Sequence, residues 1–256
     1  NPNAEDAKVL WSWHLWCTPV PQIIEYTAPR TGHEYTIMDR NVGATTSTLG
    51  LVTTQGLQYQ FGRKDPFTTS LDYDKNVAVF LRNVRSDSLP HLFSYEEPLT
   101  IAQAIGKPDV FIHRMNLSGG KWCETSEMKY LWGNQAEYFP SLTVKTIYDP
   151  CPIGYKVPPV DALMLQMKSY SQYEHGGIYY AGEEGDNTKL INMPAVHSAY
   201  HAYGTSIAYW TSSDFGKPNS TFEWGEFGFM HTYYPGSHTL RYNAFARPGS
   251  IRCVKE

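Results

Sequence analysis

The sequence predicts an α+β fold with small twisted antiparallel sheets, one or two short helices and long ordered loops. Charged residues make up only 18% of the chain, whereas aromatic residues make up 14%. Few charges combined with many tyrosines, glycines and prolines favour strands and ordered turns over long helices. In addition, several short stretches alternate between apolar and polar residues, and one stretch carries a helical apolar stripe.

Length and charge exclude several classes of protein. A chain of 256 residues can form one large domain or two modest ones, and we expect one domain over residues 9–256. Residues 1–8 are polar, and we expect a linker or a frayed N-terminus there. The net charge of -4 provides no broad basic field for nucleic acid. No apolar run approaches the roughly 18 residues that a bilayer span needs, so we expect no direct membrane insertion, and no signal peptide is recognisable.

The first predicted strand covers residues 9–16, ahead of Pro19 and Pro21. Its side chains alternate, and we expect burial on at least one face. One face carries Trp11, Trp13 and Leu15, and the other carries Ser12, His14 and Trp16.

Further short strands are expected at residues 35–39, 57–61 and 110–112. Residues 66–98 have no consistent period and are interpreted as a long loop excursion. Residues 100–105 should form one or two helical turns, with Thr100 as the N-cap.

The second half should begin with a strand over residues 151–158. A longer helix is expected from Val160 to about Tyr170, because four apolar residues fall at helical spacing there: Val160, Leu163, Met164 and Met167. The remaining strands are expected at residues 208–213, 223–230 and 250–254.

The four cysteines are Cys17, Cys123, Cys151 and Cys253, and the absence of a CxxC spacing argues against a zinc ribbon. Four reduced thiols in a cytosolic protein are one interpretation. Two disulfides in an extracytoplasmic protein are the other, and three pairings are then open. We favour disulfides because Cys151 and Cys253 each lie in a short apolar strand.

No catalytic, metal or cofactor signature stands out. His197 and His201 have HxxxH spacing, but the glutamate of a zinc-binding HExxH is missing, so they are interpreted as loop histidines. Glu183, Glu184 and Asp186 are interpreted as a solvated acidic turn, because the EF-hand spacing is absent. The chain contains no GxSxG, P-loop or GxGxxG motif.

The C-terminal third does carry a positive signal for binding. Flat, amphipathic side chains give contact area at low entropic cost, as in antibody paratopes. Alternatively, several of these rings belong to the core, because the region has few aliphatic residues. The candidate ligand-binding residues are Tyr200, His201, Tyr203, Trp224, His231, Tyr233, Tyr234, His238, Arg241, Tyr242 and Asn243.

An ordered set of motifs resembles a known family. The most characteristic are Asp39-Arg40-Asn41-Val42-Gly43, Gly56-Leu57-Gln58-Tyr59-Gln60-Phe61-Gly62-Arg63, Asp149-Pro150-Cys151-Pro152-Ile153-Gly154-Tyr155, Tyr209-Trp210-Thr211-Ser212 and Ile251-Arg252-Cys253-Val254. In this order they resemble the Fibrobacter-succinogenes-type major paralogous domain of surface proteins from Bacteroides-like bacteria. That family is similar to the C-type lectin-like fold and to formylglycine-generating enzymes.

The resemblance implies a lectin-like core mainly in residues 146–256, neighbouring N- and C-terminal strands, and a Cys151–Cys253 bridge. Cys17 and Cys123 are then left as a second pair. Lys217-Pro218-Asn219 is similar to the Pro-flanked calcium loop of C-type lectins, but a lysine replaces the ligand that precedes the proline, so no calcium site is expected. The enzymes of the related group use a cysteine pair before the last strand, and residues 238–247 contain none, so we expect no enzyme.

Three functions are therefore weighed. The first is a non-catalytic adhesion domain at the cell surface, as in fimbrial tip proteins or outer-membrane lipoproteins, which binds a glycan or protein ligand on a host or bacterial surface. The start at Asn1 is consistent with an upstream domain in such proteins. The second is a structural module that joins fimbrial subunits. The third is an enzyme related to the formylglycine-generating group, which is disfavoured because the cysteine pair is absent.

Overall fold

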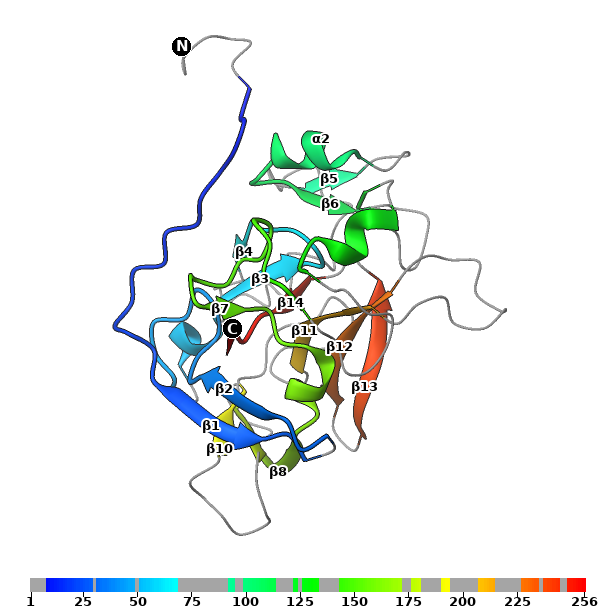
Figure 1. Ribbon diagram of the computed structural model, residues 1–256. Coiled ribbons are helices and arrows are strands. Elements are labelled where there is room, and N and C mark those ends of the chain that lie inside the picture. The colour runs from blue at the N-terminus through cyan, green and yellow to red at the C-terminus, as the bar shows by residue number, and fades with distance from the viewer. Residues whose placement is uncertain are drawn as a thin grey trace, which may run out of the picture.

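A computed structural model describes residues 8–29, 31–48, 51–68, 92–94, 99–113, 122–123, 126–133, 143–171, 176–180, 190–193, 207–214, 227–234, 237–244 and 248–256. Strands dominate these ranges and form small antiparallel and mixed sheets, with few and short helices between them (Figure 1). The predicted small sheets and short helices are therefore confirmed. None of the helices in these ranges could cross a membrane, because none is both long and apolar enough.

A four-stranded antiparallel sheet brings distant parts of the chain together. Its order is β1 (Ile23–Thr27), β2 (Glu34–Met38), β15 (Val254–Lys255) and β7 (Tyr155–Lys156). Val254 pairs with Ile37 on one side and with Lys156 on the other. The C-terminal strand therefore lies between an early strand and the strand that follows Cys151.

A six-stranded sheet is the largest element. Its order is β13 (Ser237–Ala244), β12 (Phe227–Tyr234), β11 (Ile207–Asp214), β14 (Pro248–Ser250), β3 (Leu57–Gln60) and β4 (Phe67–Thr68). Only the β11–β14 pair is parallel. Thus the N-terminal strands β3 and β4 extend a sheet whose other half comes from the C-terminal third.

The remaining strands form two smaller sheets. β8 (Gln166–Ser171), β9 (Gly176–Tyr180) and β10 (Leu190–Asn192) form an antiparallel meander, and β5 (Leu92–Ser94) pairs in parallel with β6 (Phe111–His113). The 3-10 helices are η1 (Val52–Thr54), η3 (Ser126–Tyr130) and η4 (Val160–Leu163).

The helix α2 (Ile101–Ile105) is the element that local sequence signals predicted most clearly. The Thr100 hydroxyl accepts from the Gln103 N–H at 3.2 Å, and the Gln103 side chain accepts from the Thr100 N–H at 2.8 Å. This reciprocal pair satisfies two backbone donors that the first helical turn leaves unbonded. The predicted N-cap is confirmed.

Four predicted elements differ from the structure. Residues 9–16 are extended but pair with no strand among the described residues. The helix expected to reach Tyr170 ends after Leu163, and β8 follows, because its backbone pairs with β9. The expected strands at 151–158 and 250–254 shrink to two residues each, in β7 and β15, where they can reach a ladder partner.

The core consists of two apolar clusters on either side of β11. Trp210 belongs to the larger cluster with Phe61 and Trp132, whereas the preceding Tyr209 belongs to the smaller one. Both side chains are 0% exposed. The buried indoles keep their donors satisfied: Trp210 Nε1 donates to the Tyr59 carbonyl at 2.9 Å.

Candidate functional site

The predicted binding residues fall into two groups. Tyr200, His201, Tyr203 and Trp224 lie outside the described residues. The others are on the β12–β13 hairpin, at His231, Tyr233, Tyr234, His238, Arg241, Tyr242 and Asn243.

The register of this hairpin decides which positions share a face. Tyr233 is opposite His238, and Phe229 is opposite Tyr242, so positions 231, 233, 238 and 242 belong to one face. Tyr234 is opposite Ser237, so positions 234, 241 and 243 belong to the other. The structure therefore brings these residues into one hairpin but divides them between its two faces.

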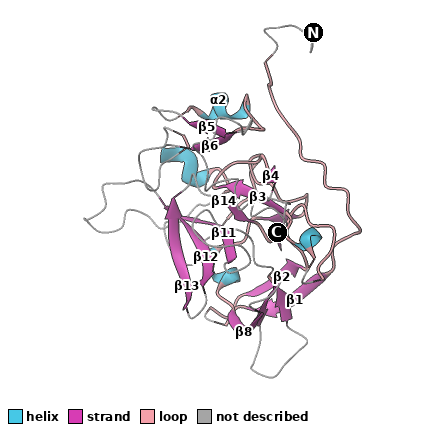
Figure 2. Cartoon of the chain, turned by 180° about the vertical axis from the view of Figure 1, so that it is seen from behind, coloured by secondary structure: helices cyan, strands magenta, loops and turns pink. Residues whose placement is uncertain are grey.

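The hairpin lies at the edge of the six-stranded sheet. β12 pairs with β11 on one side and with β13 on the other, and β13 has no further ladder partner among the described residues. Viewed from behind, the hairpin again lies along one side of the molecule, opposite the N-terminal segment (Figure 2). The outer strand of such an edge hairpin has a backbone edge available for pairing.

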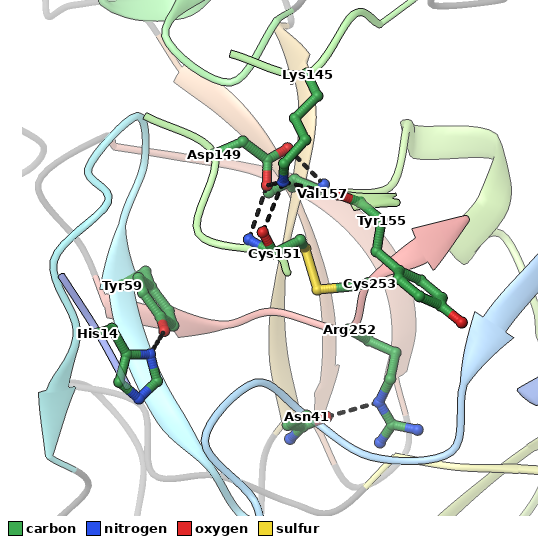
Figure 3. The surroundings of a disulfide bond; sticks show 10 residues. All are labelled: His14, Asn41, Tyr59, Lys145, Asp149, Cys151, Tyr155, Val157, Arg252 and Cys253. Atoms are coloured by element: carbon green, nitrogen blue, oxygen red, sulfur yellow. Dashed lines mark hydrogen bonds and ion pairs between the residues drawn. A yellow bond between two sulfur atoms is a disulfide. The ribbon is translucent and has the colours of Figure 1, made fainter. Parts of the chain in front are cut away.

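A disulfide fixes the base of this arrangement. Cys151 and Cys253 are bonded, with their Cα atoms 5.9 Å apart, as the family resemblance implied (Figure 3). Cys253 is 0% exposed and directly precedes β15. The bond closes a sequence separation of 102 residues, which includes β11, β12 and β13.

The carboxylate of Asp149 organises the chain around the disulfide. It accepts from the N–H groups of Cys151 and Val157 at 2.8 Å each, and from Lys145 Nζ at 3.0 Å (Figure 3). Lys145 Nζ also donates to the carbonyls of Cys151 and Tyr155. Burial raises the pKa of Asp149, and Lys145 and the two backbone donors oppose that shift.

The second expected disulfide is not formed. Cys17 is exposed on the N-terminal segment, whereas Cys123 is buried in the larger core cluster. The prediction of a Cys17–Cys123 pair was wrong, because one sulfur lies on the surface and the other inside.

A buried guanidinium links the loops behind β11. Arg252 is 0% exposed and donates to Asn41 Oδ1 at 2.8 Å and to the Met38 carbonyl at 3.2 Å. It also reaches the Asn192 carbonyl. Asn41 in turn donates to the Tyr209 hydroxyl at 2.9 Å, so the network reaches the strand that carries the hairpin. Burial lowers the pKa of Arg252, because a charged group loses its hydration there.

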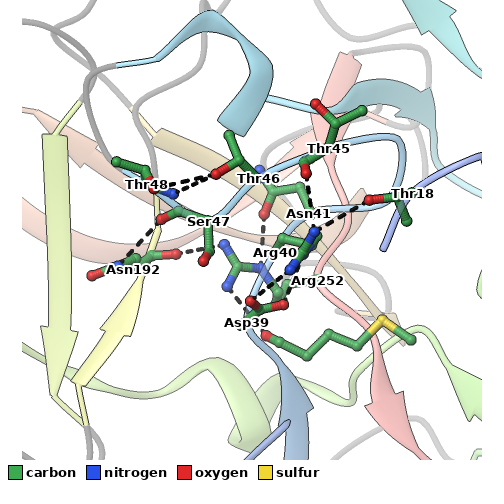
Figure 4. A network of polar contacts seen from close by, with 12 residues as sticks. Thr18, Asp39, Arg40, Asn41, Thr45, Thr46, Ser47, Thr48, Asn192 and Arg252 are labelled. Atoms are coloured by element: carbon green, nitrogen blue, oxygen red, sulfur yellow. Dashed lines mark hydrogen bonds and ion pairs between the residues drawn. The ribbon is translucent and has the colours of Figure 1, made fainter. Parts of the chain in front are cut away.

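The same loop has a second buried arginine, Arg40, which contacts the N-terminal segment. Arg40 pairs with Asp39 at 2.9 Å, and it donates to the Thr45 carbonyl and to the Thr18 hydroxyl (Figure 4). Thr18 belongs to the N-terminal segment. The loop is therefore held by Arg252 on one side and, through Arg40, by the N-terminal segment on the other.

A polar cluster around Asp161 has no signal in the sequence. Its side chain is 1% exposed and accepts from the Tyr35 hydroxyl at 2.8 Å and from the Thr31 hydroxyl at 3.0 Å, and His33 Nδ1 lies 2.9 Å away. The partners lie at least 126 residues away along the chain. These contacts attach the β1–β2 hairpin to η4, and we assign them a structural role.

No group of three or more His, Cys, Asp or Glu side chains among the described residues could hold a metal ion. The sequence features weighed for metals, namely Glu183, Glu184, Asp186, His197, His201 and Lys217-Pro218-Asn219, lie outside those residues.

Comparisons with known proteins add no assignment. No family model, curated protein or solved structure matches this chain.

Proposed function

We propose that the chain is a non-catalytic binding domain with a C-type lectin-like fold, which captures a glycan or protein ligand at a bacterial cell surface through the β12–β13 hairpin. The observation that carries the proposal is the hairpin itself. Tyrosine, histidine, arginine and asparagine positions are concentrated on two long strands at a sheet edge, and a stapled core holds that sheet in place.

The chemistry of these positions suits recognition. Tyrosine and histidine rings stack on sugar or peptide surfaces and lose little conformational entropy on binding. Arg241 and Asn243 supply hydrogen-bond donors and, for asparagine, an acceptor.

The Cys151–Cys253 bond supports an extracytoplasmic location, since disulfides persist in oxidising compartments. The position of β15 between β2 and β7 supports the lectin-like fold, in which the two ends of the domain lie together. A fimbrial tip or an outer-membrane lipoprotein is the setting that the family resemblance suggests.

A glycan array and a screen against surface proteins, each with the purified chain, test the proposal. Two paired variants separate the faces of the hairpin: Tyr233→Ala with His238→Ala, and Tyr234→Ala with Arg241→Ala. We expect one pair to lose at least about tenfold in affinity, as for truncated aromatic hot spots. Tyr130→Ala, a 46% exposed tyrosine on η3, should bind normally. Unchanged binding by both pairs would remove the hairpin as the site, and no ligand in either screen would remove the function.

A structural assembly module is the second candidate. It is favoured by the apolar side chains that the N-terminal segment exposes, including Leu10 at 84% and Trp13 at 78%. Exposed apolar rows of this kind mark contacts with other proteins.

A further inference from the structure

Residues 8–22 form an extended segment, here called the strap, which lies along the body of the molecule (Figure 1). Its even-numbered residues make the polar contacts with the body. Ser12 donates to Asp65 at 2.5 Å, His14 Nδ1 lies 3.2 Å from the Tyr59 hydroxyl, and Trp16 Nε1 donates to the Ala44 carbonyl at 2.9 Å. Figure 3 shows His14 and Tyr59 side by side.

The odd-numbered residues between them face the other way. Trp13 is 78% exposed and Leu15 is 82% exposed, and the exposed Cys17 continues the same alternation. Leu10 and Val20 do not follow this alternation, but they are likewise exposed, at 84% and 82%, toward the two ends of the strap. We call Leu10, Trp13, Leu15 and Val20 the outer row.

The outer row is unusual because its apolar side chains face solvent although the inward face of the strap could have taken them. The inward residues of the strap include polar Ser12 and His14, while the large apolar Trp13 and Leu15 face solvent. The strap backbone is also unpaired over most of its length. In the described part of the chain, its first backbone–backbone hydrogen bond is the one that the Gln22 carbonyl accepts from Asp39, at 2.9 Å.

Charge and area indicate what covers the outer row. Residues 9–24 contain no Asp, Glu, Lys or Arg, so two identical straps can approach without like-charge repulsion. The exposed fractions correspond to an apolar surface on the order of 500 Å² per copy, taking usual side-chain areas. A standard interface buries about 800 Å² per partner, so this row supplies most of a small, self-complementary interface.

We propose that the outer row packs against the outer row of a second copy of this chain, in a two-fold symmetric and concentration-dependent dimer. Trp13 and Leu15 lie at the centre of the contact, and Leu10 and Val20 lie at its ends. The proposal names the partner for the assembly candidate. It is separate from ligand binding by the hairpin, so either can fail without the other.

Molecular mass in solution tests the proposal directly. Light scattering on a dilution series of the full chain should show a mass that rises toward twice the monomer value as concentration increases. Trp13→Ser and Leu15→Ser should each keep the monomer mass over the same range. Ile153→Ser is the matched control, because Ile153 is 97% exposed but outside the strap, and it should dimerise normally. Each exchanged side chain is at least 78% exposed, so the thermal midpoints should match the unchanged chain.

The reactivity of Cys17 measures whether the outer face of the strap is covered. A thiol-reactive maleimide should label Cys17 in dilute samples and less in concentrated ones, and Trp13→Ser should abolish that protection. A chain that stays monomeric at every concentration overturns the proposal, as does a dimer that survives both strap variants. A monomer in which Cys17 is already protected also overturns it, because the row is then covered by a segment of the same chain.

Discussion

Removal of the Cys151–Cys253 disulfide is expected to lower the free energy of unfolding of this molecule strongly. The bond closes a sequence separation of 102 residues. In the chain-entropy description, a crosslink that closes about 100 residues lowers the entropy of the unfolded chain by an amount worth about 4.7 kcal/mol at 25 °C. The double variant Cys151→Ala with Cys253→Ala should therefore lose about 4 kcal/mol of unfolding free energy, a large share of the 5–15 kcal/mol that is typical of domains.

The folded state should survive this change with little rearrangement. Asp149 still holds the backbone N–H groups at residues 151 and 157, and β15 still pairs with β2 and β7. The loss should therefore come mainly from the unfolded state, which gains freedom when the crosslink is removed. The slope of unfolding free energy against urea should also increase, because the released chain exposes more surface.

Urea unfolding followed by tryptophan fluorescence measures both quantities. Cys17→Ser is the control and should leave the midpoint unchanged, because Cys17 is exposed and forms no disulfide. A loss below about 1 kcal/mol in the double variant would refute the reasoning. It would mean that the unfolded chain gains little conformational freedom when the crosslink is removed.

Three further predictions test individual contacts. Arg252→Met should cost about 3 kcal/mol or more in urea unfolding, because it removes the donor from two buried acceptors and from the partly buried Asn192 carbonyl. Burial lowers the pKa of His14 from its ordinary 6.5, because the protonated ring would lose hydration where it lies against the body, 3.2 Å from the Tyr59 hydroxyl. Strap attachment should therefore be complete above pH 6.5 and weaken as the pH falls through the lowered pKa, which a greater protease sensitivity of residues 9–18 would reveal. His14→Gln should remove that dependence, and an unchanged pH profile in the variant would contradict it. Gly133→Ala should cost more than about 3 kcal/mol, since φ is +86° and a Cβ would lie 1.8 Å from a carbonyl oxygen, whereas Gly154→Ala, at φ +81° with open space, should cost about 1 kcal/mol; equal costs would exclude the close approach as the cause.

Elements whose causes are local could be predicted from the sequence. The Thr100 cap and the helix after it depend on residues within one turn, and the structure confirms both. The strands at residues 34–38, 57–60 and 207–214 were also expected within a few residues of their bounds, because alternation and β-branched or aromatic residues are local signals. The Cys151–Cys253 disulfide was predicted from the ordered set of family motifs rather than from the spacing of the cysteines.

The prediction of a long helix after Val160 was wrong because its apolar stripe has a second explanation. Residues 160–163 are all buried, so an amphipathic face does not describe them. From residue 166 the chain pairs with β9, and cross-strand partners outweigh the modest helical preference of this segment. Periodicity alone cannot distinguish a buried turn followed by a strand from a helix of similar length.

Long-range polar contacts had no sequence signal at all. Arg252 and Asn41 are 211 residues apart, and His33 and Asp161 are 128 apart. Each is an ordinary polar residue in the sequence, and only the fold brings it beside its partner. For the strap, the predicted grouping of Trp11 with Trp13 and Leu15 was wrong, because Trp11 packs against Tyr148. The face toward the body includes Ser12 and His14, because their polar groups find partners in Asp65 and Tyr59.

The two proposed surfaces lie at opposite edges of the same sheet, and this has a consequence for binding. The hairpin forms the β13 edge, whereas the strap contacts Tyr59 on β3 and Asp65 just before β4, at the other edge. Between them the sheet spans roughly 20–25 Å, from the usual spacing of neighbouring strands. A dimer joined through its straps would therefore keep both hairpins free on its outer sides. Two weak sites on one rigid particle bind a multivalent surface far more tightly than either site alone, since the second contact is intramolecular. Weak ligand affinity of the single chain is thus compatible with firm attachment to a dense glycan or protein surface, and Trp13→Ser should lower that avidity while the affinity for a soluble ligand stays the same.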